Sequence, residues 1–417
     1  MQIGTPGHTG AAPARQANFF HGCLLLSTVI CGTLAATVIG PVLPAMQRHF
    51  ADIPHVTTLV PVVVTLPMLV LAALAIFIGW VADHVGRKRI MVGGLVLYAI
   101  AGTAPLYLDS IYLILASRAL VGVAEAAVMT CSTTMIGDYF TGNERDRYVS
   151  LQTTFASVSA FIFNLMGGIL GEHGWRVPFA VYALTLALAP LVQIFIWEPA
   201  RHPTQERRAQ PPCAARNDAE PEFSGWLLAQ VCVVSFLAGV VFLMVPVHLA
   251  FMLVELGVHA PKQIGMSYAM NSLGVILGTL SFGWLLVGRF QVMHQLLLGT
   301  VVCGLGFMLM GGAHDYASMT LGATVNGFGC GLVLPAATGW ALRTLPFARR
   351  ALGIGAFMAS QFLGYFCNPL IVMPMVAHMG SRLPVVNIWG ILLIVVAIVV
   401  LIGSFGTHRR KLSKQSG

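Results

Sequence analysis

The amino-acid sequence predicts an all-α membrane protein with twelve transmembrane helices in two pseudo-symmetric six-helix bundles. Of its 417 residues, 57% are hydrophobic and only 9% are charged, whereas a soluble domain carries about 25% charged residues. So few charges cannot cover the surface of a soluble protein of this size, which excludes a soluble enzyme, a nucleic-acid-binding domain and a disordered chain. The hydrophobic residues also fall in blocks of about 20–25, long enough to cross a hydrocarbon core of roughly 30 Å.

Twelve predicted spans follow from the apolar blocks. In the first half of the chain they cover residues 20–45, 56–80, 90–107, 111–137, 148–170 and 177–197. In the second half they cover residues 225–250, 263–286, 294–312, 317–341, 350–376 and 385–406. Pro and Gly occur within several spans, which a helical bundle tolerates because neighbouring helices satisfy the freed backbone groups.

The basic residues predict the orientation of the chain in the membrane. If the amino terminus is cytoplasmic, eighteen of the 23 Lys and Arg residues lie on that side, four lie on the other side, and Arg118 alone lies within a span. Cytoplasmic loops collect Lys and Arg in this way. We therefore expect a multi-pass protein of the inner or plasma membrane with both termini in the cytoplasm. The same distribution accounts for the net charge of +8 without a nucleic-acid partner.

One long polar stretch divides the chain into an N-terminal half, residues 1–197, a cytoplasmic linker, residues 198–224, and a C-terminal half with a short tail, residues 225–417. The linker is rich in Pro, Arg and Glu, which predicts a flexible segment. The halves repeat weakly, since an offset of 205 places Pro41 on Pro246. Two parallel halves related by an axis along the membrane normal are the plan of a rocking transporter with its site at the midplane.

The sequence contains no pattern typical of a metal or cofactor site. The thirteen histidines form no H-x-x-H or H-x-x-x-H box, and the eight cysteines have no C-x-x-C pair. These spacings are the usual signatures of zinc sites and redox motifs. We expect neither a metal nor a cofactor, and no enzymatic activity.

The connection between the second and third predicted spans reads Gly79-Trp80-Val81-Ala82-Asp83-His84-Val85-Gly86-Arg87-Lys88-Arg89. Glycine permits the sharp reversal that a tight connection needs. A carboxylate such as Asp83 is favoured near the start of the following helix and can pair with nearby arginines. The alternative interpretation is a basic loop that serves only to orient the chain.

This connection resembles the signature loop G-x-x-x-D-x-x-G-R-R/K-x of the major facilitator superfamily. The resemblance extends over the whole chain through the twelve spans, the central linker and the half-chain repeat, and it implies that family's fold. It also implies a conformational latch, whose candidate residues are Gly79, Asp83, Gly86, Arg87, Lys88 and Arg89. The charged stretch that closes the fourth span resembles the family's short inner loop and adds Asp138 and Arg145, although a solvated loop is the alternative interpretation.

The fourth span carries two charged residues, Arg118 and Glu125, in the stretch Arg118-Ala-Leu-Val-Gly122-Val-Ala-Glu125-Ala. Charges inside a membrane are costly unless they are paired or functional. Seven residues are nearly two helical turns, so both side chains project from one face about 10 Å apart along the axis. A carboxylate in a desolvated site holds a proton more tightly than one in water. Glu125 is therefore a candidate proton carrier, and Arg118 could hold an anion or tune that carboxylate. The alternative is that both residues only anchor the span through polar contacts.

The pattern R-x-x-x-G resembles the fourth-span motif of proton-coupled members of the superfamily. The added acid, R-x-x-x-G-x-x-E-A, is similar to organic-anion transporters and spinster-like lipid transporters. The first span, from Cys23 to Ala45, lacks the charged residue that those branches usually carry there.

Polar residues at helical spacing predict the lining of a cavity, because polar groups in lipid-buried helices turn inward. The candidates lie in the fifth, eighth and eleventh spans. They are Gln152, Asn164, Tyr268, Asn271, Gln361, Tyr365 and Asn368. For each of them, hydrogen bonding between helices without contact to a ligand is the alternative.

These observations predict a secondary active transporter that moves a small organic molecule by alternating access. Proton-coupled efflux of a fairly hydrophobic molecule, with Glu125 as the protonation site, is the preferred interpretation. Proton-coupled uptake of an organic anion, with Arg118 as counter-charge, is the second, and a non-transporting sensor or scaffold is the third. The expected partners are the small-molecule substrate, protons and the lipid bilayer, with the chain a monomer.

Overall fold

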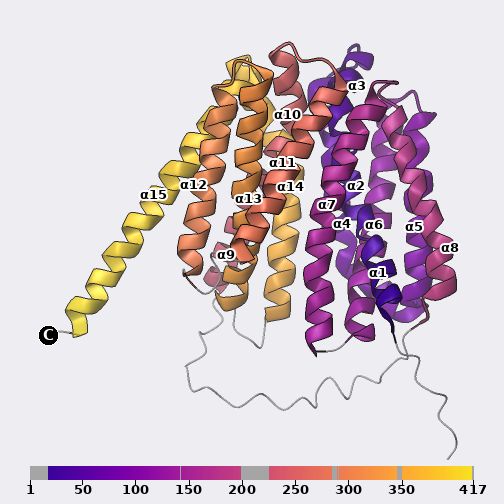
Figure 1. Ribbon diagram of the computed structural model, residues 1–417, viewed down its shortest axis with the longest axis horizontal. Coiled ribbons are helices and arrows are strands. Elements are labelled where there is room, and N and C mark those ends of the chain that lie inside the picture. The colour runs from indigo at the N-terminus through magenta and orange to yellow at the C-terminus, as the bar shows by residue number, and fades with distance from the viewer. Residues whose placement is uncertain are drawn as a thin grey trace, which may run out of the picture.

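A computed structural model describes residues 17–140, 142–198, 225–283, 289, 291–344 and 350–415 of the protein. The predicted linker, residues 198–224, lies outside these residues except for Glu198. Within the described chain the regular structure is helical and makes twelve passes through an elongated bundle (Figure 1). The predicted all-α fold of two six-helix bundles is confirmed.

Six passes make up the N-terminal half. The first is broken into several helices, and the third and sixth each include a 3₁₀ turn. In chain order the elements are α1 Phe19–Ser27, α2 Ile30–Thr37, η1 Gly40–Val42, α3 Leu43–His49, α4 Val56–Val85, α5 Arg87–Thr103, η2 Ala104–Leu106, α6 Ile111–Tyr139, α7 Gly142–Gly171, η3 Val177–Ala183 and α8 Leu184–Phe195.

The C-terminal half makes the other six passes, and its first pass is also broken. Its elements are α9 Gly225–Phe242, α10 Met244–Glu255, α11 Pro261–Ser281, α12 Val292–Gly311, α13 Tyr316–Thr344, α14 Arg350–Met379 and α15 Arg382–Gln415. Toward its C-terminus α15 runs away from the neighbouring helices (Figure 1).

Eleven segments of the described chain are long and apolar enough to cross a membrane. The described part of the eighth predicted span, α11, is not among them, and residues 284–286 of that predicted span lie outside the described residues. Ser267, Asn271 and Ser272 are polar residues within this helix. The helix tolerates them because it is packed between α7 and α13, where protein groups satisfy them.

The two ends of the bundle are distinguished here by their connections. The motif end contains the α4–α5 connection at Gly86, and the distal end contains the α10–α11 connection, residues 256–260. In Figure 1 the motif end is at the bottom and the distal end at the top. The first pass of each half is broken near a proline, with Pro41 in η1 and Pro246 in the first turn of α10, as the half-chain repeat predicts.

Each half buries a hydrophobic core of its own, and the halves meet along two helix pairs. The N-terminal core gathers residues of α1 to α8 together with Phe251 of α10, and the C-terminal core gathers residues of α10 to α15. Across the interface α7 packs on α11 and α4 packs on α14. A smaller cluster joins the halves near the middle of the bundle: Met68, Leu243 and Val247, with Ala36, Phe362 and Tyr365 against them.

Candidate functional site

Glu125 lies in the middle of α6 and is only 5% exposed. Its Oε1 is 3.4 Å from the position that a Cβ atom would take on Gly32, in the broken first pass, and the sulfur of Met129 is nearby. Its Oε2 is buried and has no hydrogen-bond partner among the described residues. A buried carboxylate without a partner is costly in its charged form. The arrangement therefore favours a carboxyl group that carries a proton in at least one state of the protein.

Arg118, two turns away on α6, points into the N-terminal half and is 1% exposed. Its Nη2 donates hydrogen bonds of 3.0 Å to the carbonyls of Ala101 and Gly102, at the end of α5. Its guanidinium carbon lies 5.3 Å from the ring centroid of Phe179 and 4.9 Å from that of Tyr182. Carbonyls of a last helical turn lack intrahelical donors, and the aromatic rings favour a cation. Arg118 therefore makes the contacts of a residue that holds α5, α6 and η3 together, and its predicted role as a substrate counter-charge stays a prediction.

Two tyrosines link this arginine to the broken first pass. Tyr98 and Tyr182 stack with centroids 5.3 Å apart. The Tyr98 hydroxyl donates to the carbonyl of Cys31, and the Tyr182 hydroxyl donates to that of Leu34 at 3.5 Å. Both carbonyls belong to the segment that Glu125 faces. Sequence reasoning missed these tyrosines because an isolated aromatic residue in an apolar span gives no periodic signal.

Replacement of Arg118 by Leu should destabilise the ligand-free protein by about 2–4 kcal/mol, because two backbone carbonyls lose a charged donor and two rings lose a cation. Thermal unfolding of the purified protein measures this change. The matched control is Arg176→Leu, which removes an exposed pair with Asp109 and should cost less than about 1 kcal/mol. Unchanged stability together with selective loss of anion binding would instead support the counter-charge role.

The predicted latch residues converge on Arg87, at the start of α5. The Arg87 guanidinium lies 2.9 Å from Asp83 Oδ1 and also pairs with Asp138 at the end of α6. Glu198, which follows α8, accepts hydrogen bonds from the backbone amides of Arg87 at 2.7 Å and Lys88 at 3.0 Å. A carboxylate at a helix N-terminus satisfies free amides and is favoured by the helix dipole. The cluster therefore ties α4, α5, α6 and the end of the sixth pass together.

Glu198 was missed because sequence reasoning assigned it to the linker. Gly86 has φ = 114° and a Cβ there would lie 3.3 Å from Glu198, so glycine provides both the backbone geometry and the space. Gly79 packs near Thr130 of α6, Arg89 is exposed, and the side chain of Arg145 lies outside the described residues. Each described contact of this cluster lies within the N-terminal half, so a latch between the halves stays a prediction.

Three of the predicted cavity residues lie on the interface between the halves. Asn164 of α7 donates a buried hydrogen bond of 3.0 Å to Ser272 of α11. Tyr268, on the same face of α11 and 3% exposed, lies against Gly40 of the first pass. Tyr365 of α14 belongs to the central cluster that joins the halves. These residues are therefore placed where motion between the halves would change their surroundings.

Two other cavity candidates bond between helices of the C-terminal half. Asn271 donates to the carbonyl of Ala323 at 2.7 Å, and Asn368 donates to that of Val240 at 2.8 Å. The Asn368 oxygen is 3.1 Å from Nε2 of His248, a fully buried histidine that sequence reasoning missed. Gln361 is 9% exposed, and Gln152 is partly buried in α7. No hydrogen bond joins either glutamine side chain to another described residue. Whether these four residues line a cavity stays a prediction.

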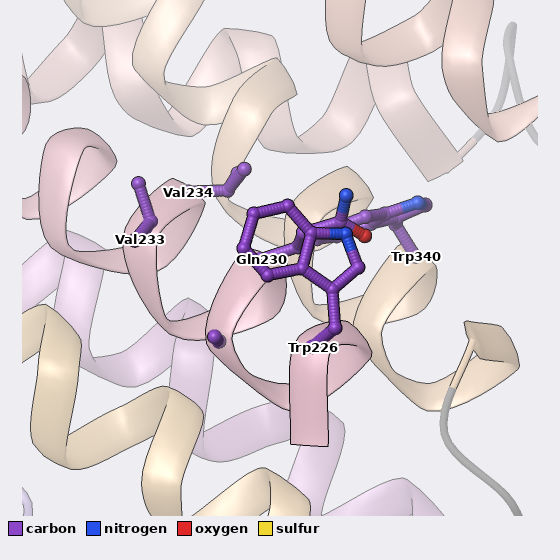
Figure 2. Close-up of a pocket in the computed structure, with 6 residues that line it drawn as sticks. Trp226, Gln230, Val233, Val234 and Trp340 are labelled. Carbon is purple, nitrogen blue, oxygen red and sulfur yellow. The ribbon is translucent and has the colours of Figure 1, made fainter. Parts of the chain in front are cut away.

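A groove of about 420 Å³ lies between α9 and α13, toward the motif end. Trp226 and Trp340 stand over it, with Gln230, Val233 and Val234 along α9 (Figure 2). Its lining comes from the C-terminal half alone. Val233 is 57% exposed, as expected for an apolar wall that faces lipid, so this groove does not include Glu125.

The architecture defines the class of protein: a multi-pass helical membrane protein of two six-helix bundles in which the buried carboxyl group of Glu125 faces the first pass. The chain belongs to the Major Facilitator Superfamily, whose family model matches residues 25–369. The predicted family is confirmed, and the protein is accordingly a membrane transporter and not an enzyme.

Curated relatives include proteins named as transporters of small organic molecules. The chain is 26% identical over 307 residues to the 3-(3-hydroxy-phenyl)propionate transporter of Escherichia coli strain K12, covering 72% of this chain and 73% of that protein. It is 30% identical over 127 residues to protein spinster homolog 3 of Danio rerio, covering 30% of this chain and only 26% of that protein.

Solved structures share the fold at low sequence identity. A bacterial homolog of the human lysosomal transporter Spinster, in an inward-facing and occupied conformation, superposes with a TM-score of 0.70 and 14% identity, over 93% of this chain and 96% of that one. A POT family transporter in complex with 5-aminolevulinic acid superposes with a TM-score of 0.71 and 13% identity, over 93% and 97%.

Proposed function

We propose that the protein moves a small organic molecule by alternating access and that Glu125 carries the coupling proton. The single observation that supports this proposal is the carboxyl group of Glu125, buried, without a partner for Oε2 and facing the backbone of Gly32. Protonation neutralises such a carboxyl group and removes the desolvation cost of its charge, and it requires no new contact with the protein. Rocking of the halves then exposes the group to one side and to the other, so that protons load and leave on different sides.

Efflux of a fairly hydrophobic molecule is our preferred direction. The cluster of Met68, Leu243 and Val247 with Ala36, Phe362 and Tyr365 joins the halves near the middle of the bundle, as deep as Glu125. It is apolar except for the hydroxyl of Tyr365. Met68, Phe362 and Tyr365 supply polarizable and aromatic surface, which suits an apolar solute.

Uptake of an organic anion with a proton is the second candidate. The relative that aligns over 72% of this chain is named for an aromatic carboxylate, 3-(3-hydroxy-phenyl)propionate. Proton uptake by Glu125 would offset the negative charge of such a substrate. We propose the same orientation for both candidates, with the motif end and both termini in the cytoplasm, because Lys and Arg gather at that end.

Flux measurements in proteoliposomes test the proposal and its direction. With 3-(3-hydroxy-phenyl)propionate as the labelled probe, an inward proton gradient should drive uptake if the anion is co-transported. A labelled quaternary ammonium dye, whose fixed charge prevents trapping by protonation, should instead be expelled toward the acidic side if efflux is correct. A gradient of one pH unit is worth about 1.4 kcal/mol, or roughly ten-fold accumulation for one proton per solute. Gradient-independent flux of both probes would refute proton coupling, and absence of any flux or counterflow would favour the sensor.

A further inference from the structure

Tyr268 occupies an unusual place in the turn of α10 that follows Pro246. Its hydroxyl accepts a hydrogen bond from the amide of Ala250 at 3.2 Å and donates one to the carbonyl of Pro246 at 3.1 Å. Residues 246 and 250 are the i and i+4 positions that an α-helix joins directly. A side-chain hydroxyl from α11 therefore bonds both backbone groups of this turn, and a side chain that enters the helical hydrogen-bond ladder is a recognised cause of local bending.

The other edge of the Tyr268 ring rests on the opposite half of the protein. The ring carbon Cζ lies 3.3 Å from the position that a Cβ atom would take on Gly40. Gly40 begins η1, the 3₁₀ turn that breaks the first pass. One side chain thus contacts the break near Pro41 in the N-terminal half and the turn after Pro246 in the C-terminal half.

The surrounding contacts show that this face of α11 closes the distal end of the interface. Gly265, one turn before Tyr268, meets Gly168 of α7 so closely that a Cβ on Gly265 would lie 2.6 Å from the Gly168 Cα. One turn beyond, Ser272 accepts the hydrogen bond from Asn164. Gly265, Tyr268 and Ser272 share one face of the helix by their spacing of three and four residues, and all three contact the N-terminal half.

We infer that Tyr268 couples closure of the distal end to the shape of α10. While the halves touch at this end, Gly40 supports the ring and the hydroxyl stays between Ala250 and Pro246. When the halves separate, the ring loses this support and can turn away, which leaves the Ala250 amide and the Pro246 carbonyl without the hydroxyl as a partner. The turn of α10 then has two arrangements, one with the Tyr268 hydroxyl bound and one without it. Contact between the halves favours the arrangement with the hydroxyl bound. Tyr268 is therefore a positioning residue for the conformational cycle and not a ligand contact. The inference rests on alternating access and is independent of proton coupling.

Replacement of Tyr268 by Phe removes the hydroxyl and keeps the ring. The closed distal end then loses two bonds that the open state does not use, so the ratio of closed to open protein should fall about five-fold, as expected for about one net hydrogen bond. Hydrogen exchange of the purified, ligand-free protein, followed by mass spectrometry, measures the change. Exchange should rise about five-fold in residues 40–49 and 164–171, which belong to the N-terminal half.

The matched control is Tyr316→Phe. The Tyr316 hydroxyl also donates to a backbone carbonyl at the distal end, that of Gln263, at 3.1 Å, but the bond lies within the C-terminal half. Tyr316→Phe should therefore leave hydrogen exchange in residues 40–49 and 164–171 unchanged. If Tyr268→Phe alters exchange only in α10 and α11, or acts like Tyr316→Phe, the inference is overturned.

Ser272→Ala, which breaks the bond to Asn164 and spares Tyr268, should raise exchange in residues 40–49 and 164–171. Unchanged exchange in this variant would also contradict closure by this face of α11. Neither substrate nor a pH gradient enters the measurement, so its failure is distinguishable from failure of the proposed proton coupling.

Discussion

Replacement of Glu125 by Gln should abolish the response of transport to an imposed pH gradient while leaving counterflow of unlabelled for labelled solute. Gln has nearly the shape of a protonated Glu but cannot release a proton. Because Oε2 has no partner among the described residues, the substitution breaks no ion pair there and should not unfold the protein. Wild-type accumulation of roughly ten-fold per pH unit should fall to equilibration in the variant, measured in proteoliposomes.

Glu125→Asp is the control for this experiment. It keeps a carboxyl group and withdraws it by one methylene from the backbone of Gly32, so coupling should persist at a reduced rate. Wild-type dependence on the gradient in Glu125→Gln would remove Glu125 from the proposed mechanism. Loss of counterflow as well would show that the residue is needed for more than the proton.

Replacement of Gly265 by Ala should prevent full closure of the distal end. The new Cβ would lie 2.6 Å from the Cα of Gly168 and 2.7 Å from the carbonyl oxygen of Asn164. Backbone atoms cannot rotate away, so the α7–α11 contact must widen. Overpacking of this kind costs about 1–3 kcal/mol, which corresponds to a shift of roughly 5- to 150-fold in the ratio of closed to open protein. Hydrogen exchange in residues 164–171 should rise by that factor, and transport should slow because one half of the cycle becomes unfavourable.

Gly355→Ala provides the matched control in the same half. Gly355 is an exposed glycine inside α14 with no atom within 4 Å of the new Cβ, so alanine should be neutral or stabilise the helix by about 0.5–1 kcal/mol. Normal exchange and transport in Gly265→Ala would mean that the α7–α11 contact is not a moving interface.

The helical passes were predictable because a membrane imposes long apolar blocks on the sequence. The eighth pass carries polar residues within such a block. A protein-packed helix such as α11 need not be as hydrophobic as one that faces lipid, because protein groups bond its polar side chains. Breaks in the first and seventh passes were visible only as prolines, because the sequence does not show which side chains satisfy the opened backbone.

The candidate site was predictable in its charges and not in its contacts. Arg118 and Glu125 were found because charged residues are rare within membrane spans. The tyrosines at Cys31 and Leu34, the capping carboxylate of Glu198 and the histidine beside Asn368 have ordinary sequence surroundings. Each acts through a partner 67 or more residues away in the chain, and no local pattern encodes such a pairing.

Composition and periodicity by themselves determined that this chain lies in a membrane, passes through it twelve times and carries two charges on one face of its fourth span. The tertiary structure decided how those two charges differ. The same helix face brings Arg118 to the free carbonyls of α5 and the rings of η3, and brings Glu125 to the bare backbone of Gly32. Helical spacing gives the direction of a side chain on its own helix, whereas the neighbour that it meets depends on how distant helices pack. That neighbour separates a cation whose Nη2 is bonded to two backbone carbonyls, with its Nε and Nη1 unpartnered among the described residues, from a carboxyl group left available for a proton.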